Sequence, residues 1–137
     1  MKLNCECIRD VLLALERFDF LSENSFGEID TEMMAIDELA EALPRYTVPE
    51  LLYTLLRLEE GGYITASKKY ADDALQYFCV TGITFDGHEL LERLRPETVW
   101  AKSLSILKKL GSFSLDLLSS VSGSILTAEA SRWITGS

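Results

Sequence analysis

The segment Thr47–Ile64, with the sequence TVPELLYTLLRLEEGGYI, decides the expected fold of this chain. Thr47 is a favourable N-cap, and Pro49 falls in the first helical turn, where its missing N–H costs nothing. Leucines then recur at three- and four-residue spacing, which predicts one buried helix face, and the pair Gly61-Gly62 ends the helix. The leucines expected in the core or at its margin are Leu51, Leu52, Leu55, Leu56 and Leu58. This layout is typical of the second helix of a helix-turn-helix and the turn into a wing.

The residues before this segment predict two further helices. Asn4 can cap a first helix, whose apolar residues recur at helical spacing. A second helix is expected over Asp37–Leu43, with Asp30 or Thr31 available as its cap. The intervening segment Ser22–Thr31 contains asparagine, serine and glycine, and these residues predict a loop.

The residues after the segment predict a β-hairpin. Tyr63–Ser67 and Gln76–Thr84 are rich in β-branched and aromatic residues, and Lys68–Leu75 between them is expected as a loop. A fourth helix then opens at Asp86-Gly-His-Glu89, which has the form of an aspartate capping box, and Pro96 breaks it. The order of three helices, a hairpin and a helix is that of a winged helix.

The C-terminal part of the chain is also expected to be helical. One helix includes Val99 to Leu110 and stops at Gly111, and Ser114 can cap another. The predicted fold class is therefore mainly α (α+β). It consists of a winged helix-turn-helix with a small β-hairpin wing over residues 1–96, a C-terminal helical extension over 97–126, and a frayed tail over 127–137.

Two stretches resemble a known family. Met1-Lys-Leu-Asn4 followed by Cys7-Ile-Arg-Asp-Val-Leu-Leu13 resembles the opening of a family of small bacterial and prophage proteins, catalogued as domain of unknown function 2513. Thr84-Phe-Asp-Gly-His-Glu-Leu-Leu91 with Val99-Trp100 resembles its later signature, and the resemblance runs from Met1 to about Ile125. It implies a winged-helix-like core and a frequent home on phages and mobile elements. It implies no activity, and therefore no catalytic residues.

The negative charge of the chain is concentrated in its first half. The net charge is −9 over 137 residues. Residues 1–66 carry five basic and fourteen acidic side chains, whereas residues 67–137 carry eight of each. DNA binding draws much of its affinity from cations that contact phosphates, so an acidic helix-turn-helix favours a basic partner instead.

The sequence contains no motif of a familiar enzyme class. It has no Gly-rich phosphate loop, nucleophile elbow or zinc-binding histidine pair, and the lone His88 is expected as a surface or boundary residue. Cys5, Cys7 and Cys79 lack the paired spacing of a metal site, and their odd number suggests reduced thiols. We therefore expect a non-enzymatic protein without metal or cofactor. The absence of a signal-peptide pattern and of a long apolar run predicts a cytoplasmic location.

One functional hypothesis is a DNA-binding transcriptional regulator. Tyr53, Thr54 and Arg57 lie on the expected exposed side of the third helix, where such residues can contact bases and phosphates. Lys68 and Lys69 are expected at the tip of the wing, where they can contact phosphates. The alternative for the lysine pair is that it keeps an exposed hairpin soluble.

The favoured hypothesis is a protein-interaction or regulatory module. The acidic first half suits a basic surface on a host protein. Leu117, Val121 and Ile125 form an apolar stripe at four-residue spacing, and that stripe needs an apolar partner. The partner is either the body of the same chain or a second copy, which would give a homodimer through the C-terminal helices. Asp116 and the neighbouring serines offer no basic face for lipids, so no membrane contact is expected.

Overall fold

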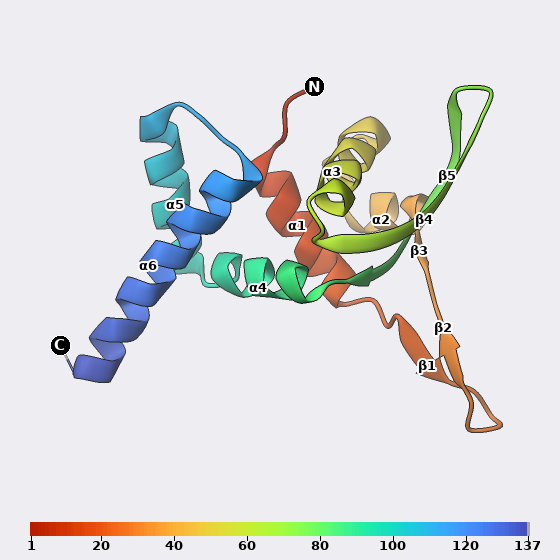
Figure 1. Ribbon diagram of the computed structural model, residues 1–137, viewed down its shortest axis with the longest axis horizontal. Coiled ribbons are helices and arrows are strands. Elements are labelled where there is room, and N and C mark those ends of the chain that lie inside the picture. The colour runs from red at the N-terminus through yellow and green to blue at the C-terminus, as the bar shows by residue number, and fades with distance from the viewer. Residues whose placement is uncertain (137) are drawn as a thin grey trace. The chain divides into compact units, whose positions relative to one another are not determined.

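The computed structural model describes residues 1–136, which contain six helices and two antiparallel sheets (Figure 1). The fold is therefore α+β, as the sequence predicts at that level. The chain divides into a first unit, Met1–His88, and a second unit that begins at Glu89. In the first unit the elements are α1 (Cys5–Glu16), β1 (Leu21–Glu23), β2 (Ile29–Thr31), β3 (Met34–Ala35), α2 (Ile36–Ala42), α3 (Val48–Glu60), β4 (Ile64–Ala71) and β5 (Ala74–Ile83). Helix α4 (Phe85–Leu94) crosses the division, and α5 (Glu97–Leu110) and α6 (Leu115–Thr135) follow.

Helices α1 and α3 begin at the predicted caps. The Asn4 Oδ1 atom accepts hydrogen bonds from the backbone N–H groups of Glu6 and Cys7, at 2.9 and 3.4 Å. The Thr47 Oγ1 atom accepts one from the N–H of Glu50 at 3.3 Å. One apolar face of each helix is buried in the core of the first unit. The fully buried residues of these faces are Ile8, Val11, Leu12 and Leu15 of α1, and Leu51, Leu55 and Leu58 of α3. Leu52 and Leu56 are half-buried at the margin.

A three-stranded antiparallel sheet in the order β3-β5-β4 completes this core. The central strand β5 buries Phe78 and Val80, and it pairs Val80 with Met34 of β3 and with Ala66 of β4. Because alternate residues of a strand point to opposite faces, Phe78 and Val80 share the core face of the sheet. Strand β4 follows α3 after a short glycine turn, so the β4–β5 hairpin starts beside the C-terminal end of α3 (Figure 1).

The β4–β5 hairpin is longer than the sequence analysis predicts. The two strands pair as far as Ala71 and Ala74, and Asp72 and Asp73 form the turn with φ values of 52° and 63°. Aspartate tolerates this left-handed backbone better than most residues other than glycine. Lys68 and Lys69 therefore lie within β4, and the expectation that they occupy the tip of the wing is wrong.

Strands β1 and β2 form a second hairpin, where the sequence analysis predicts a loop. They pair antiparallel over three residues each. The turn is fixed by Asn24, whose Oδ1 atom accepts hydrogen bonds from the N–H groups of Phe26 and Glu28 at 2.9 and 3.0 Å. Gly27 has a φ of 77°, which a residue with a side chain rarely adopts. The hairpin extends away from the helices of the first unit (Figure 1).

Helix α2 lies within a residue of its predicted bounds, but its cap differs. Ala35 occupies the N-cap position and makes no side-chain hydrogen bond there. Asp30 and Thr31 lie in β2, so neither residue caps α2. The helix starts directly from β3, and its buried residue Leu39 packs in the core of the first unit.

The junction between β5 and α4 is held by Thr84 and Gly87. Thr84 Oγ1 accepts a hydrogen bond from the Gly87 N–H at 3.0 Å and donates one to the Gly62 carbonyl at 2.6 Å. The cap of α4 is therefore Thr84, and the prediction of an Asp86 capping box is wrong. A Cβ atom on Gly87 would lie 2.0 Å from the Tyr63 carbonyl oxygen, so only glycine fits against this turn.

The second unit contains a helix pair, α5 and α6, that follows the buried end of α4. Leu90, Leu91 and Leu94 of α4 are fully buried. Helix α5 ends at Gly111, which has a φ of 67°, and α6 begins at Ser114, whose Oγ atom accepts the Leu117 N–H at 3.0 Å. Helix α6 continues to Thr135, so residues 127–135 are helical where the sequence analysis predicts a frayed tail. Ser137 lies outside the described residues.

Candidate functional site

Arg57, the central cation expected on α3, is held flat on its own helix. Its Nη2 atom lies 2.8 Å from the Glu60 carboxylate, and its guanidinium lies 5.3 Å from the centre of the Tyr53 ring. Its Nε atom is buried and has no hydrogen-bond partner within the described residues. The charge of Arg57 is therefore paired with Glu60, and its guanidinium is stacked on Tyr53, both about one helical turn away on α3.

Lys68 is also paired, and this pair joins β4 to α3. Its Nζ atom contacts the carboxylate of Glu59, whose side chain is only 21% exposed. Lys69 is exposed and, across the described residues, has no carboxylate partner. It is the next residue along a strand, so its side chain points to the opposite face of the sheet from Lys68. The two lysines that the sequence places together therefore do not act on one surface.

Thr54 is buried, and the expectation that it lies on the exposed side of α3 is wrong. Its side chain is 2% exposed. Its hydroxyl donates to the Glu50 carbonyl at 2.9 Å and lies 3.2 Å from Cys7 Sγ of α1. Burial, as the largest cause, raises the pKa of the Cys7 thiol, so the thiol stays protonated at neutral pH. Thr54 thus joins α3 to α1 and cannot contact a partner.

The surface formed by α3 and β4 is called here the α3–β4 face. It carries the cations Arg57 and Lys68 and the carboxylates of Glu50, Glu59 and Glu60. The hairpin turn beyond it adds Asp72 and Asp73, both exposed. Carboxylates therefore outnumber cations where a DNA-binding winged helix would place its phosphate contacts.

The proposed self-association stripe lies along α6. Leu117, Val121 and Ile125 are each half-buried within the single chain. The fully buried residues of α6 are Leu118 and Ser122, one position further along. The stripe thus flanks the face of α6 that packs inside the second unit, and a homodimer through it stays a prediction.

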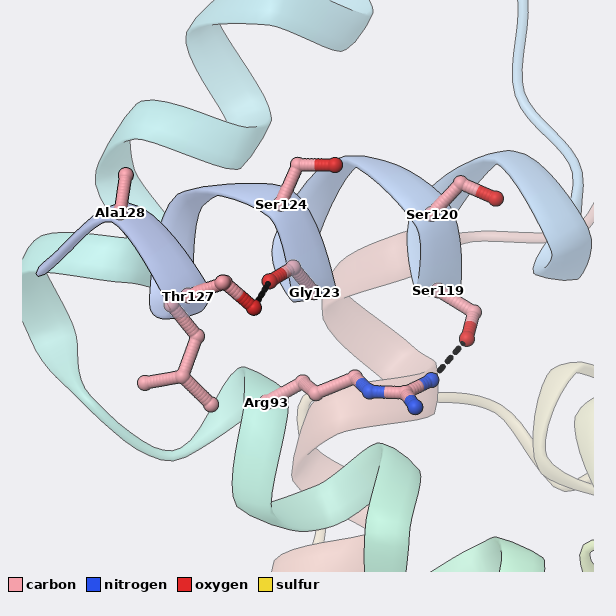
Figure 2. Close-up of a pocket in the computed structure, with 8 residues that line it drawn as sticks. Arg93, Ser119, Ser120, Gly123, Ser124, Thr127 and Ala128 are labelled. Atoms are coloured by element: carbon pink, nitrogen blue, oxygen red, sulfur yellow. Dashed lines mark hydrogen bonds between the residues drawn. The ribbon is translucent and has the colours of Figure 1, made fainter. Parts of the chain in front are cut away.

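A groove of about 760 Å³ lies along α6 in the second unit (Figure 2). Figure 2 shows the Arg93 side chain lying along the groove and donating a hydrogen bond to the Ser119 hydroxyl. A Cβ atom on Gly123 would meet Arg93 Nε at 3.4 Å, so the glycine lets the guanidinium lie close to the helix. These contacts indicate that Arg93 holds α4 against α6.

A polar cluster ties α1 to the turn before α3. The Tyr46 hydroxyl donates to Asp10 Oδ2 at 2.7 Å, and Arg45 contacts Glu6 at 2.7 Å and Asp10 at 3.5 Å. Burial and the hydrogen bond to Asp10, in that order, raise the pKa of Tyr46 well above its usual range. We assign the cluster a structural role, because its hydroxyl, carboxylate and guanidinium groups form hydrogen bonds or ion pairs with one another.

The residues that could support catalysis or metal binding are dispersed. His88 is exposed in the first turns of α4, and Cys5, Cys7 and Cys79 are free thiols. Within residues 1–136 no three His, Cys, Asp or Glu side chains gather as metal ligands would. In the same range, no helix has the length and apolar character that crossing a membrane requires.

The family comparison matches residues 2–114 to the family described as Hypothetical protein (DUF2513). The chain belongs to this family. That confirms the family that the opening residues and the Gly87-His88 signature resemble. The match to DUF2513 ends at Ser114, the cap of α6, so α6 lies beyond the matched segment. No curated protein and no solved structure matches the chain.

One surface of this DUF2513 protein is not predicted from its sequence. Leu21, Phe26 and Ile29 of the β1–β2 hairpin are exposed by 65%, 84% and 63%. One signal points to the hairpin, since Asn24 and Gly27 are turn residues. The strands Leu21–Glu23 and Ile29–Thr31 are only three residues long and hold one apolar residue each, so they show no alternation from which a strand could be predicted.

Proposed function

We propose that this DUF2513 protein is a winged-helix module that acts by binding another protein, without catalysis of its own. The observation that carries the proposal is the pairing of Arg57 with Glu60 and of Lys68 with Glu59 on the α3–β4 face. The element order α1, β3, α2, α3, β4, β5 and the sheet order β3-β5-β4 support a winged helix in which α3 holds the recognition position.

The paired cations argue against DNA as the partner. Non-specific DNA affinity comes from cations that replace the counterions on phosphates. Exposed ion pairs such as Arg57–Glu60 are worth only about 0–1 kcal/mol, so phosphate could displace Glu60 from Arg57, whereas the Lys68–Glu59 pair is less exposed. Both carboxylates would nevertheless stay beside the phosphates, and Asp72 and Asp73 of the hairpin turn would add further negative charge. The net electrostatic contribution to DNA binding is then close to zero or repulsive.

The overall charge supports a basic protein partner. Residues 1–88 carry seven basic and seventeen acidic side chains, a net charge of −10, whereas residues 89–137 carry six basic and five acidic. A surface with this charge attracts and orients a basic surface during association. We place the protein in the reducing cytoplasm, which its three free thiols suit, and on a phage or prophage, as the family resemblance implies.

The proposal is tested by capture from a nuclease-treated bacterial extract. Tagged protein and a tagged unrelated protein of similar net charge are used as parallel baits, and the retained proteins are identified by mass spectrometry. We expect a small set of basic proteins retained by this chain alone and released by raising the salt. Recovery of no protein by this chain, together with a clear shift of duplex DNA, would overturn the proposal.

A further inference from the structure

The β1–β2 hairpin presents apolar side chains on a fixed turn. The Asn24 side chain accepts the N–H groups of Phe26 and Glu28, and the Asn24 N–H donates to the Glu28 carbonyl at 2.9 Å. This network orders the turn while the Phe26 ring, 84% exposed, has almost no cover. A turn ordered before binding loses less conformational entropy when a partner covers it.

A cleft of about 420 Å³ opens at the base of the same hairpin. The segment between α1 and β1 supplies Phe18 and Phe20, whose rings meet edge to face with centroids 4.9 Å apart. Leu21 and Ile83 add further apolar surface, and His88 also lines the cleft. A concave, mostly apolar site of this size can take one large side chain of a partner.

The hairpin around these apolar groups is acidic. Residues 19–32 contain five acidic side chains and no basic one. Asp19, Glu23, Glu28 and Asp30 have no ion-pair partner within the described chain, in contrast to Glu59 and Glu60 of the α3–β4 face. Their charge is therefore available to an incoming cation.

We propose that the β1–β2 hairpin and the cleft at its base bind a basic protein segment that carries a large apolar side chain. The apolar side chain enters the cleft and packs against Leu21, and flanking lysines or arginines meet the carboxylates of the hairpin. This inference rests on the proposed function, because it names the surface through which the protein partner is bound.

The charge of the hairpin selects among possible occupants. Two copies of the chain would bring two acidic hairpins together, and like charges in contact disfavour that arrangement. Nucleic acids and anionic lipids carry the same sign as the hairpin. A basic protein segment is the occupant that satisfies both the apolar cleft and its acidic surroundings.

The test uses the full chain and a fluorescein-labelled peptide KKWLKK, with EEWLEE and KKSSKK as matched probes. Fluorescence anisotropy measures the affinity of each probe at about 50 mM salt, where exposed charges are weakly screened. We expect KKWLKK to bind more tightly than either matched probe. Phe26→Ser, Leu21→Ser and the double variant Glu28→Lys/Asp30→Lys should each weaken binding about tenfold or more.

Two control variants test whether the effect is local. Trp133→Ser removes an equally exposed aromatic ring from α6, and Glu41→Lys reverses an exposed charge on α2. Both should leave the affinity for KKWLKK within about twofold of wild type. Circular dichroism and thermal unfolding confirm that each hairpin variant keeps the fold, as expected for exposed positions.

The outcomes separate this inference from the function on which it rests. Equal binding of KKWLKK and KKSSKK, or unchanged affinity in the hairpin variants, would overturn the hairpin site. So would a change of oligomeric state on Phe26→Ser, measured by sedimentation, because a second copy would then cover the surface. If the extract proteins are captured equally by wild type and Phe26→Ser, the protein-binding function stands and the site lies elsewhere. If wild type captures nothing, the function itself fails.

Discussion

Gly87 sits where helix propensity and packing oppose each other. In a helix interior, alanine is favoured over glycine by about 1 kcal/mol. Here an added Cβ would lie 2.0 Å from the Tyr63 carbonyl oxygen and 2.7 Å from Ile83 Cγ2, so the backbone of the junction would have to shift. We expect Gly87→Ala to lower the free energy of unfolding by about 3 kcal/mol, measured by urea titration.

Gly111 is the matched control for that substitution. It has a φ of 67° and no atom within 4 Å of its would-be Cβ, so alanine there meets only backbone strain. Gly111→Ala should cost about 1 kcal/mol, clearly less than Gly87→Ala. A Gly87→Ala protein as stable as wild type would show that the β5–α4 junction has room for a Cβ atom at this position.

Tyr46 gives the stability of the protein a pH dependence in the alkaline range. Its pKa is raised in the folded state by burial and by its hydrogen bond to Asp10. An unfolded tyrosine titrates near pH ~10, so its stabilising contribution is complete below that pH and is lost as the pH rises further.

The variant that tests this is Tyr46→Phe. It should lower the free energy of unfolding at about pH 8 by about 1.5 kcal/mol, the scale of a hydrogen bond to a charged acceptor. At about pH 11 the difference in free energy of unfolding between the two proteins should shrink or vanish. At that pH the wild-type tyrosine ionises in the unfolded protein but stays protonated in the folded one, which favours unfolding. A difference that stays constant between these two pH values would contradict the assignment. Urea unfolding at both pH values measures it.

The α3–β4 face gives a prediction for two ion pairs together. Glu59→Gln/Glu60→Gln would release Lys68 and Arg57 from their carboxylates. Duplex DNA, which wild type is predicted not to bind, should then bind detectably at about 50 mM salt and be released again at about 200 mM salt. Glu38→Gln/Glu41→Gln makes the same charge change on exposed positions of α2 and should have a smaller effect. Equal effects of the two double variants would mean that overall charge, and not the pairing, sets DNA affinity.

Helix α6 is part of the folded second unit although it lies beyond the segment matched to the family. Leu118 is fully buried, whereas Trp133 near the end of the same helix is 85% exposed. Leu118→Ala should lower the free energy of unfolding by about 2–4 kcal/mol through loss of apolar contact and creation of a cavity. Trp133→Ala should change it by less than about 0.5 kcal/mol. Thermal unfolding of both variants, followed by circular dichroism, checks the contrast.

Helices were predictable from the sequence where a cap and an apolar period agree. Asn4, Thr47 and Ser114 each accept the backbone N–H groups that the sequence assigns to them, and Gly111 ends α5. The α4 cap was misassigned because Thr84 and Asp86 are both good capping residues two positions apart. The contact that decides between them, from Thr84 to Gly62, is distant in sequence and therefore not visible in a local pattern.

The hairpins and the candidate site were harder to predict, for physical reasons. The β4–β5 turn depends on the left-handed backbone of Asp72 and Asp73. Because the turn is only these two residues, the strand pairing includes Lys68 and Lys69. Thr54 looks like a surface residue in sequence, but its hydroxyl is satisfied by its own helix, which removes the cost of burying it. Ion pairs between α3 and β4 depend on tertiary packing, which no local pattern specifies.

The molecule as a whole separates its charge by unit. The first unit holds the entire net negative charge, together with both hairpins and the α3–β4 face. The second unit is nearly neutral and contributes the helix pair α5–α6. This charge distribution supports the proposed binding of a basic protein surface.

The measurement that tests this account most directly is a fluorescence-anisotropy titration of the wild-type protein with random-sequence duplex DNA. It is carried out at about 50 mM and about 200 mM salt, the range over which phosphate-driven affinity falls steeply. We predict no binding at either concentration, because the cations of the α3–β4 face are offset by Glu50, Glu59 and Glu60. Binding at about 50 mM salt that collapses at about 200 mM would contradict the account and show that the protein contacts phosphates.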